Sequence, residues 1–221
     1  DDHAGGARAV LRDVEVGELW VGEGSERDPL TSIVIADAVV RGVASRRLKR
    51  GDIVQRAGME LEVLHPGVRD RNRSLNDRCL VVRAQTIDGA SILLPGDLEA
   101  AGERALLAAG ANPRAGALVA PHHGADGSST VAFLARVSPR LVLLSVGAGN
   151  RFGHPGEAAR ARFAAAAARV LRTDRDGSIT LENVGGTWRA SVEKERRGDE
   201  REDEDGRERD RDREAAGAER L

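Results

Sequence analysis

The chain has 221 residues and a formal net charge of −2. This bulk charge argues neither for nor against a nucleic-acid partner. A single cysteine, Cys79, excludes an internal disulfide and a zinc site built from several cysteines, and we expect it to have no disulfide partner. With two Trp, three Phe and no Tyr, the core must consist of Val, Leu, Ile and Ala. No apolar run approaches the ~20 residues of a membrane span, so we expect this chain alone to be soluble.

Hydrophobic periodicity and turn signals predict helices and strands that alternate along the chain. In order they are a helix at 7–11, a strand at 18–21, a helix at 29–43, strands at 59–64, 79–84 and 91–94, a helix at 98–109, a strand at 117–120, a helix at 130–137, a strand at 141–146, a helix at 155–170, and strands at 178–181 and 187–192. Asp88-Gly89 predicts a hairpin between the third and fourth strands. The pattern predicts an α/β fold with a mixed sheet.

The composition changes near residue 193. Residues 1–192 alternate apolar and polar segments and are predicted to form one domain. From 193 to 221 the sequence is dominated by Arg, Asp and Glu and has no apolar face to bury. We therefore expect this charged tail to be disordered.

The segment 121–129, Pro-His-His-Gly-Ala-Asp-Gly-Ser-Ser, follows a short apolar strand. Its glycines allow a sharp turn of the backbone, and imidazole is the commonest metal ligand and the usual acid or base near neutral pH. Taken alone, the pair His122 and His123 fits a solvated surface loop equally well. The positions of the other histidines decide between the two interpretations.

All five histidines stand at the ends of predicted elements or in Gly/Pro loops, and Asp97 directly follows the strand that ends near Gly96. Ligands of α/β sheets gather at the carboxyl ends of the strands. Mixed His and Asp ligands suit Zn²⁺ or Mn²⁺. The residues expected to meet at one such edge are Asp2, His3, Asp97, His122, His123 and His154.

Each residue also has a simpler explanation. Asp97 fits the N-cap of the helix that follows it, and His3 fits a frayed terminus. His154, before Pro155, fits the end of a loop. His65, before Pro66, is interpreted as a surface turn and left out of the site.

Three motifs resemble the C-terminal domain of the ComEC family, the DNA-internalisation proteins of natural competence. They are Pro-His-His-Gly with downstream serines at 121–129, Asn-Arg-Phe-Gly-His-Pro at 150–155, and Arg-Thr-Asp with Gly-Ser-Ile at 172–179. Asp-His-Ala-Gly-Gly at 2–6 and Leu-Pro-Gly-Asp at 94–97 also resemble parts of the metallo-β-lactamase metal motifs. The resemblance covers roughly residues 1–182 and implies a metallo-β-lactamase-like αββα sandwich with mixed sheets.

The resemblance also implies a role for each matching residue. Asp2 and His3 would be metal ligands and Asp97 would bridge two ions, with His122, His123 or His154 as the last histidine ligand. Histidines that are not ligands become acid/base groups or phosphate contacts, and Asp97 takes part in catalysis. The residues expected to contact substrate phosphate or orient a neighbouring loop are Ser128, Ser129 and Asn150.

Two departures from the family pattern lower the expected metal content. The histidine usual on the hairpin before Gly-Asp is absent, and Asn76 stands near its place. The first half of the metal motif would precede residue 1, so we interpret the chain as a fragment, incomplete at its N-terminus. We expect it to hold at most one of the two Zn or Mn ions and to be weakly active or inactive.

The function implied is a metal-dependent hydrolase, a phosphodiesterase or nuclease acting on DNA, with single-stranded DNA as substrate during competence-linked uptake. Such a domain is attached to the membrane channel domain of the same full-length protein, so membrane association would arise through absent upstream segments. One alternative is a stand-alone metallo-hydrolase of a small ester or phosphodiester. The other is a non-catalytic DNA-handling domain of the same fold, which the asparagine at position 76 favours.

Overall fold

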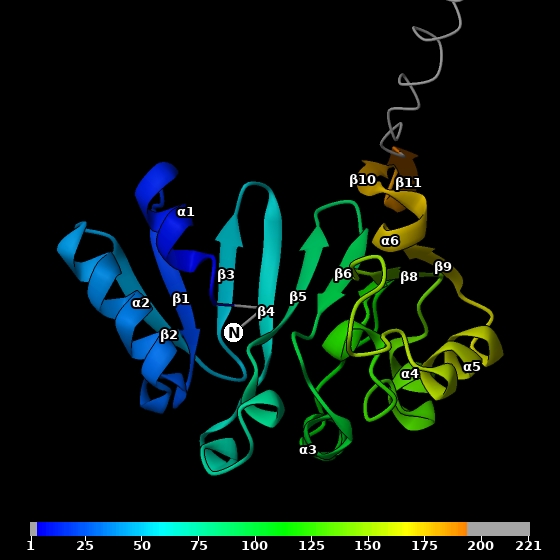
Figure 1. Ribbon diagram of the computed structural model, residues 1–221, viewed down its shortest axis with the longest axis horizontal. Coiled ribbons are helices and arrows are strands. Elements are labelled where there is room, and N and C mark those ends of the chain that lie inside the picture. The colour runs from blue at the N-terminus through cyan, green and yellow to red at the C-terminus, as the bar shows by residue number, and fades with distance from the viewer. Residues whose placement is uncertain (1–3, 194–221) are drawn as a thin grey trace, which may run out of the picture.

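The computed structural model describes residues 4–193 (Figure 1), so Asp2, His3 and residues 194–221 lie outside the described residues. The helices are α1 Ala7–Asp13, α2 Pro29–Val40, α3 Ala100–Ala108, α4 Val131–Val137, α5 Glu157–Ala165 and α6 Thr173–Asp176. The strands are β1 Glu18–Gly22, β2 Ala44–Leu48, β3 Ile53–Arg56, β4 Met59–His65, β5 Val81–Thr86, β6 Ser91–Leu94, β7 Ala117–Val119, β8 Leu141–Leu144, β9 Arg169–Arg172, β10 Ser178–Val184 and β11 Thr187–Glu193.

A seven-stranded sheet in the order β3-β4-β5-β6-β7-β8-β9 forms the centre of the molecule. Strands β3 to β6 pair antiparallel, and β6 to β9 pair parallel. The predicted α/β fold with a mixed sheet is confirmed. Parallel neighbours need crossover connections, and α3, α4 and α5 lie in those connections.

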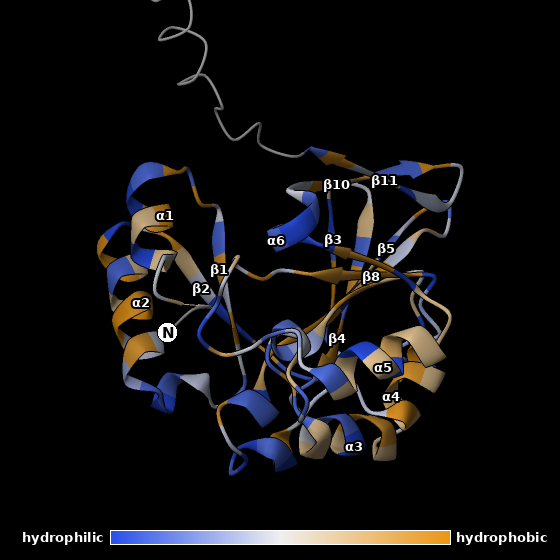
Figure 2. Cartoon of the chain, turned by 45° about the vertical axis from the view of Figure 1, so that its right-hand side comes forward, coloured by the Kyte–Doolittle hydropathy of each residue, from blue (hydrophilic) through white to orange (hydrophobic). Residues whose placement is uncertain are grey.

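The parallel half of the sheet is covered on both faces. On one face, Leu106 of α3, Phe133 of α4 and Phe163 of α5 pack with strand residues in the largest core cluster. On the other face, the hairpin β10–β11 packs Ile179 and Trp188 against the same strands. Figure 2 shows the hydrophobic colour on central strands such as β8, between these two layers. Burial on both faces explains why the sequences of these strands are continuous apolar runs.

A smaller layer lies beside the antiparallel half. Strands β1 and β2 pair parallel, and Leu48 of β2 packs with Val54 and Val63 of the large sheet. Helices α1 and α2 cover this pair through a cluster of Leu11, Val34 and Ala38. No helix among residues 4–193 is both long and apolar enough to cross a membrane.

Several elements differ from the sequence prediction. The predicted helix at 155–170 is shorter, because α5 ends at Ala165 and Ala167 adopts a φ of 53° that leads the chain into β9. Burial of Leu171 against the hairpin offsets the helix propensity of the alanine run. Strands β2 and β3, on either side of the Gly51-Asp52 turn, were not predicted.

The interpretation of His65 as a surface turn was wrong. Its side chain is fully buried at the end of β4, and its Nε2 lies 2.7 Å from the carbonyl oxygen of Asp77. Its Nδ1 lies 3.5 Å from Asp70, a buried carboxylate that also binds Arg50 and Arg73 at 2.7 Å each. This network ties the arginine-rich segment to the end of β4, although His65 Nδ1 itself makes no hydrogen bond with any described residue.

Candidate functional site

The four parallel strands end at one edge of the sheet, and the predicted site residues among the described residues follow those ends. Asp97 follows β6, His122 and His123 follow β7, and His154 lies in the loop after β8. The ring centroid of His122 lies 5.6 Å from that of His154 and 6.5 Å from that of His123. The structure brings these four side chains together because parallel strands share the edge at which their carboxyl ends lie.

The turn Pro121–Gly124 has an unusual backbone. His122 and His123 have φ angles of 49° and 53°, and Gly124 has a φ of 80°. For residues other than glycine the left-handed conformation costs about 1–2 kcal/mol. A Cβ atom at Gly124 would lie 2.6 Å from Leu144 and 2.9 Å from Pro155. The packing therefore requires glycine there, and strain of this kind concentrates at functional sites.

Asp97 and His123 face each other across the ends of β6 and β7. His123 Nε2 lies 3.8 Å from Asp97 Oδ1, and its Nδ1 lies 2.8 Å from the carbonyl oxygen of Ser145. That carbonyl accepts a hydrogen bond from Nδ1, so Nε2 is the ring nitrogen that faces the carboxylate. Asp97 is not the N-cap of α3, because the helix begins at Ala100 and Glu99 is its N-cap.

Glu99 is a residue of this site that the sequence reasoning missed. Its Oε1 lies 3.2 Å from His122 Nδ1 and accepts a hydrogen bond of 3.0 Å from Asn76 Nδ2. His122 Nδ1 is buried and makes no hydrogen bond of good geometry with any described residue. Asn76 therefore holds the Glu99 carboxylate beside His122. The only signal in the sequence is that Glu99 stands two residues after Asp97.

The loop after β8 positions His154. Asn150 accepts a hydrogen bond from the backbone N–H of His154 at 2.9 Å and donates one to its carbonyl oxygen at 2.7 Å. Burial lowers the pKa of His154, and the nearby His122 and His123 lower it further. In this structure Asn150 shapes its own loop, and its predicted contact with substrate stays a prediction.

A pocket of about 430 Å³ opens beside His123 and His154. Phe152, whose ring is stacked on His154 with centroids 6.0 Å apart, forms part of its wall. Thr173 of the Arg-Thr-Asp motif closes another side, and its Oγ1 accepts from the backbone N–H of Val146 at 2.8 Å. The pocket therefore joins all three of the motifs that the sequence singled out.

The predicted role of Ser128 and Ser129 in phosphate binding requires correction. Both residues are fully buried. Ser128 Oγ is bound to the carbonyl oxygens of Pro121 at 2.9 Å and Ala125 at 3.0 Å. A hydroxyl buried in this way does not face a phosphate in solvent. In this structure Ser128 stabilises the loop that carries the histidine pair, whereas Ser129 Oγ makes no hydrogen bond with any described residue.

Two charged residues on flanking helices hold the end of this loop. Glu103 of α3 accepts hydrogen bonds from the backbone N–H groups of Ser129 and Thr130. Arg162 of α5 donates to the carbonyl oxygens of Asp126, Ser128 and Ser129, each at 2.8 Å. No local sequence signal predicts these contacts.

The donor chemistry of the site fits a divalent ion in part. Asp97 and His123 have the arrangement of a ligand pair, with the far ring nitrogen of the histidine held by a carbonyl. Within residues 4–193, no group of three or more His, Cys, Asp and Glu side chains could hold a metal. Burial raises the pKa of Cys79 to about 11, so this thiol is protonated near neutral pH and does not supply a thiolate. Asp2 and His3, the other predicted ligands, lie outside the described residues.

Comparison with known proteins relates the chain to competence proteins. It is 34% identical over 178 residues to ComE operon protein 3 of Bacillus subtilis (strain 168), covering 80% of this chain and 23% of that protein. It is 36% identical over 140 residues to competence protein ComA of Neisseria gonorrhoeae, covering 63% of this chain and 19% of that protein. The uncharacterized protein YcaI of Escherichia coli (strain K12) is 28% identical over 149 residues, which are 66% of this chain and 19% of that protein. No family model matches the chain.

These alignments cover 19% to 23% of each relative, so the chain spans about a fifth of their length. The chain is therefore related to one segment of competence proteins, and this part of the resemblance drawn from its motifs is confirmed. The metallo-β-lactamase-like fold and the metal site stay predictions.

Proposed function

We propose that the chain belongs to a competence protein of the ComEC family and forms its metal-dependent phosphodiesterase domain, acting on DNA. The observation that carries the proposal is the facing pair of Asp97 Oδ1 and His123 Nε2, 3.8 Å apart. Two ligand-type atoms that face each other at the carboxyl edge of a sheet suit the binding of a cation between them. The similarity to competence proteins supports DNA as the substrate.

The two residues have distinct parts in this proposal. Asp97 supplies negative charge at a nearly buried position, with 8% of its surface exposed. His123 presents Nε2 toward Asp97, because the Ser145 carbonyl engages the other ring nitrogen, Nδ1. Asp2 and His3 would complete the ligand set. A divalent ion held there would lower the pKa of a bound water molecule and neutralise charge on the phosphate.

His154 and His122 serve as proton-transfer groups. The pKa of His154 lies below its ordinary value because the ring is partly buried among other imidazoles, so it is neutral near pH 7 and able to accept a proton. Glu99 orients the ring of His122, whose Nδ1 lies 3.2 Å from Glu99 Oε1. In this proposal His154 is the proton acceptor and His122 the proton donor beside Asp97 and His123.

An exposed aromatic residue at the site supports a nucleic-acid substrate. Phe152 is 66% exposed, whereas Phe133 and Phe163 are fully buried. The guanidinium carbon of Arg151 lies 4.9 Å from the centre of the Phe152 ring. The guanidinium of Arg151 over an exposed ring forms a planar, cationic surface that suits an unpaired base and its phosphate. This arrangement favours a single-stranded polynucleotide over a small ester.

The fold proposed is the metallo-β-lactamase-like αββα sandwich. Its support is the layered arrangement in which α3, α4 and α5 cover one face of the mixed sheet and β10–β11 covers the other. Because the relatives are much longer than this chain, we further propose that the domain is joined to a membrane channel domain that delivers the DNA strand.

The decisive experiment measures metal content and cleavage of single-stranded DNA, on residues 1–221 and on the corresponding full-length competence protein. Asp97→Asn and His123→Gln are compared with Asp13→Asn, which removes an exposed carboxylate on α1. The proposal is supported if the protein binds Zn or Mn and cleaves the strand, if Asp97→Asn and His123→Gln lose both properties, and if Asp13→Asn keeps them.

A folded full-length protein with neither metal nor cleavage would refute it. The remaining candidate is then a non-catalytic DNA-handling domain. That alternative is favoured by Asn76, which stands near the place where the resembled family has a histidine ligand.

A further inference from the structure

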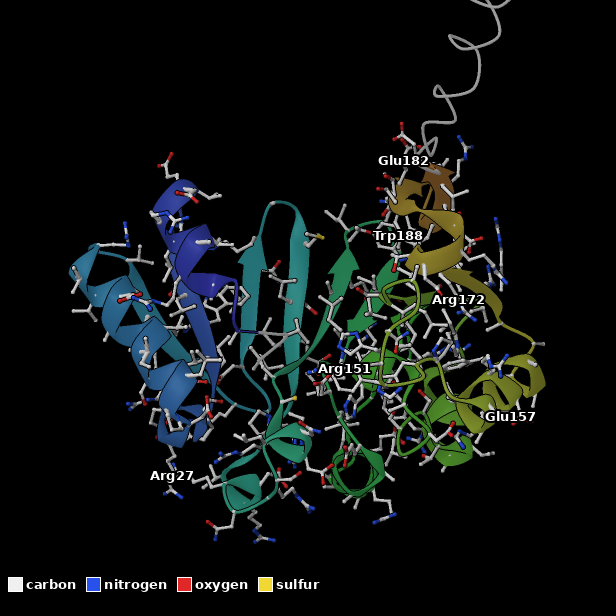
Figure 3. The ribbon with its side chains drawn as sticks, in the orientation of Figure 1. Arg27, Arg151, Glu157, Arg172, Glu182 and Trp188 are labelled. Atoms are coloured by element: carbon white, nitrogen blue, oxygen red, sulfur yellow. The ribbon has the colours of Figure 1, made fainter. Side chains whose placement is uncertain are left out.

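A second pocket lies at the other end of the parallel strands, away from the histidines. It encloses about 460 Å³ and is bounded by segments that precede β6, β7 and β8 and by the turn between β10 and β11. Three arginines line it, Arg83, Arg114 and Arg140, and no Asp or Glu does. In Figure 3 Trp188, in the wall of this pocket, lies well apart from Arg151, which is beside the histidine site.

The positive charge of this pocket is only partly neutralised. Arg83 lies 3.5 Å from Glu62, and its Nε donates to the carbonyl oxygen of Arg114 at 2.8 Å. The guanidinium groups of Arg114 and Arg140 make no hydrogen bond or ion pair with any residue of the described range 4–193. Two cations that share a concave surface without acids form a site for an anion.

Asp88, next to the lining residue Gly89, is a carboxylate that is already engaged. Asp88 accepts hydrogen bonds from Thr86 at 2.6 Å, from Asn183 at 2.7 Å and from the backbone N–H of Gly186 at 3.0 Å. Hydrogen bonds from Thr86 and Asn183 lower its pKa. Asp88 therefore anchors the β10–β11 turn at the mouth of the pocket.

The pocket also has a rigid aromatic wall. Trp188 donates its indole N–H to the carbonyl oxygen of Ser91 at 2.7 Å, which fixes the plane of its ring. Gly116 and Gly186 line the same cavity and expose backbone in place of side chains. A fixed, half-buried indole beside cations is suited to contact with a nucleobase.

We propose that this pocket binds a nucleotide, either free or as one unit of a strand, with its phosphate between Arg114 and Arg140 and its base or sugar against Trp188. Arginine presents a planar fork of donors that matches phosphate oxygens. A volume of about 460 Å³ exceeds the need of a lone phosphate and lies in the range of small-molecule pockets. None of these residues belongs to the histidine site, so the inference does not depend on hydrolysis.

The test titrates residues 1–221 with three probes: inorganic phosphate, thymidine 5′-monophosphate and a single-stranded oligothymidylate. Binding is measured by calorimetry and by the NMR signal of the Trp188 indole N–H. The double variant Arg114→Gln/Arg140→Gln is expected to weaken nucleotide binding by about tenfold or more. Its matched control is Arg104→Gln/Arg136→Gln, which removes two exposed arginines of α3 and α4 outside the pocket.

Loss of binding in the pocket variant alone, with a shift of the Trp188 signal in the unmodified chain, would support the proposal. Binding of the monophosphate would identify a free nucleotide as sufficient, and binding of the oligonucleotide alone would identify a unit of a strand. Three outcomes would each overturn it. They are an equal loss of binding in both double variants, phosphate binding as tight as nucleotide binding, and no binding of any probe. The shift of the Trp188 signal with thymidine 5′-monophosphate is expected to persist in Asp97→Asn, because Asp97 lies outside this pocket, and this separates the result from the fate of the proposed hydrolysis.

Discussion

The carboxylate of Glu103 accepts a hydrogen bond of 2.9 Å from the backbone N–H of Thr130. Glu103 is fully buried on α3, and Thr130 is the N-cap of α4. The same carboxylate also accepts the backbone N–H of Ser129, so one acid ties two helices to the end of the loop with the histidine pair. Burial raises the pKa of Glu103, and its N–H donors and Arg162 oppose that rise.

Substitution of Glu103 is expected to destabilise the whole domain. Glu103→Ala leaves two backbone donors in the core without an acceptor, and each such donor costs about 1–3 kcal/mol. We expect the free energy of unfolding, measured by urea denaturation, to fall by about 2–4 kcal/mol.

The control is Glu15→Ala, which removes an exposed carboxylate and is expected to change stability by less than about 0.5 kcal/mol. Equal stability of the two variants would show that the Glu103 carboxylate does not hold the loop.

The buried His65 predicts a loss of stability in mild acid. Burial lowers its pKa in the folded state, whereas in the unfolded chain the pKa is about 6.5. The unfolded state therefore binds more protons once the pH falls below that value, and folding stability decreases with falling pH. Urea unfolding at several values between pH 7.5 and 5 is expected to show this decrease, with a smaller slope in His65→Gln.

Other titratable groups also change folding stability in this pH range, so the experiment needs a comparison that isolates His65. The lowered pKa of His154, like that of His65, makes folding stability decrease as the pH falls. The raised pKa of Glu103 has the opposite effect. Its contribution to folding stability is present at low pH and decreases as the pH rises. The difference between the unmodified chain and His65→Gln isolates His65. Identical pH profiles for the two would contradict its burial as a neutral ring.

The left-handed backbone of His122 predicts an unusual preference for glycine. Its φ of 49° disfavours any residue with a Cβ atom. We expect His122→Gly to be more stable than His122→Ala by about 1 kcal/mol, as measured by thermal or urea unfolding. At an ordinary helical position the order is reversed, so a more stable alanine variant would refute this backbone conformation.

The exposed ring of Phe152 is expected to affect binding and not stability. Phe152→Ala should weaken binding of a single-stranded oligonucleotide by about fivefold or more, since a stacked base contributes about 1–3 kcal/mol. Fluorescence anisotropy with a labelled strand measures this change, and Phe152→Trp is expected to keep the affinity. The melting temperature should stay close to that of the unmodified chain because Phe152 is 66% exposed.

Val131→Ala is the matched control for this prediction. Val131 is 71% exposed and lies on α4, outside the pocket beside the histidines. Equal affinity of Phe152→Ala and Val131→Ala would show that the ring at position 152 does not contact the strand.

Much of the fold followed from local pattern. The alternation of apolar runs and helical segments predicted a mixed α/β sheet, and most strands and helices of the structure overlap predicted ones. Strand β9 was missed because it directly follows a run of alanines, which favours a helix when it is read alone. Burial of Leu171 with Ala117 and Leu141, two residues distant from it in sequence, favours the strand.

The sequence by itself determined which chemical groups stand at the ends of the strands, Asp97, His122, His123 and His154 among them. Because the carboxyl ends of parallel strands share one edge, their convergence was predictable from strand order. Only the tertiary structure decided that His65 and the two serines are buried and that Glu99 stands beside His122. Burial and side-chain pairing depend on what packs over a residue from distant parts of the chain, and no local pattern contains that information.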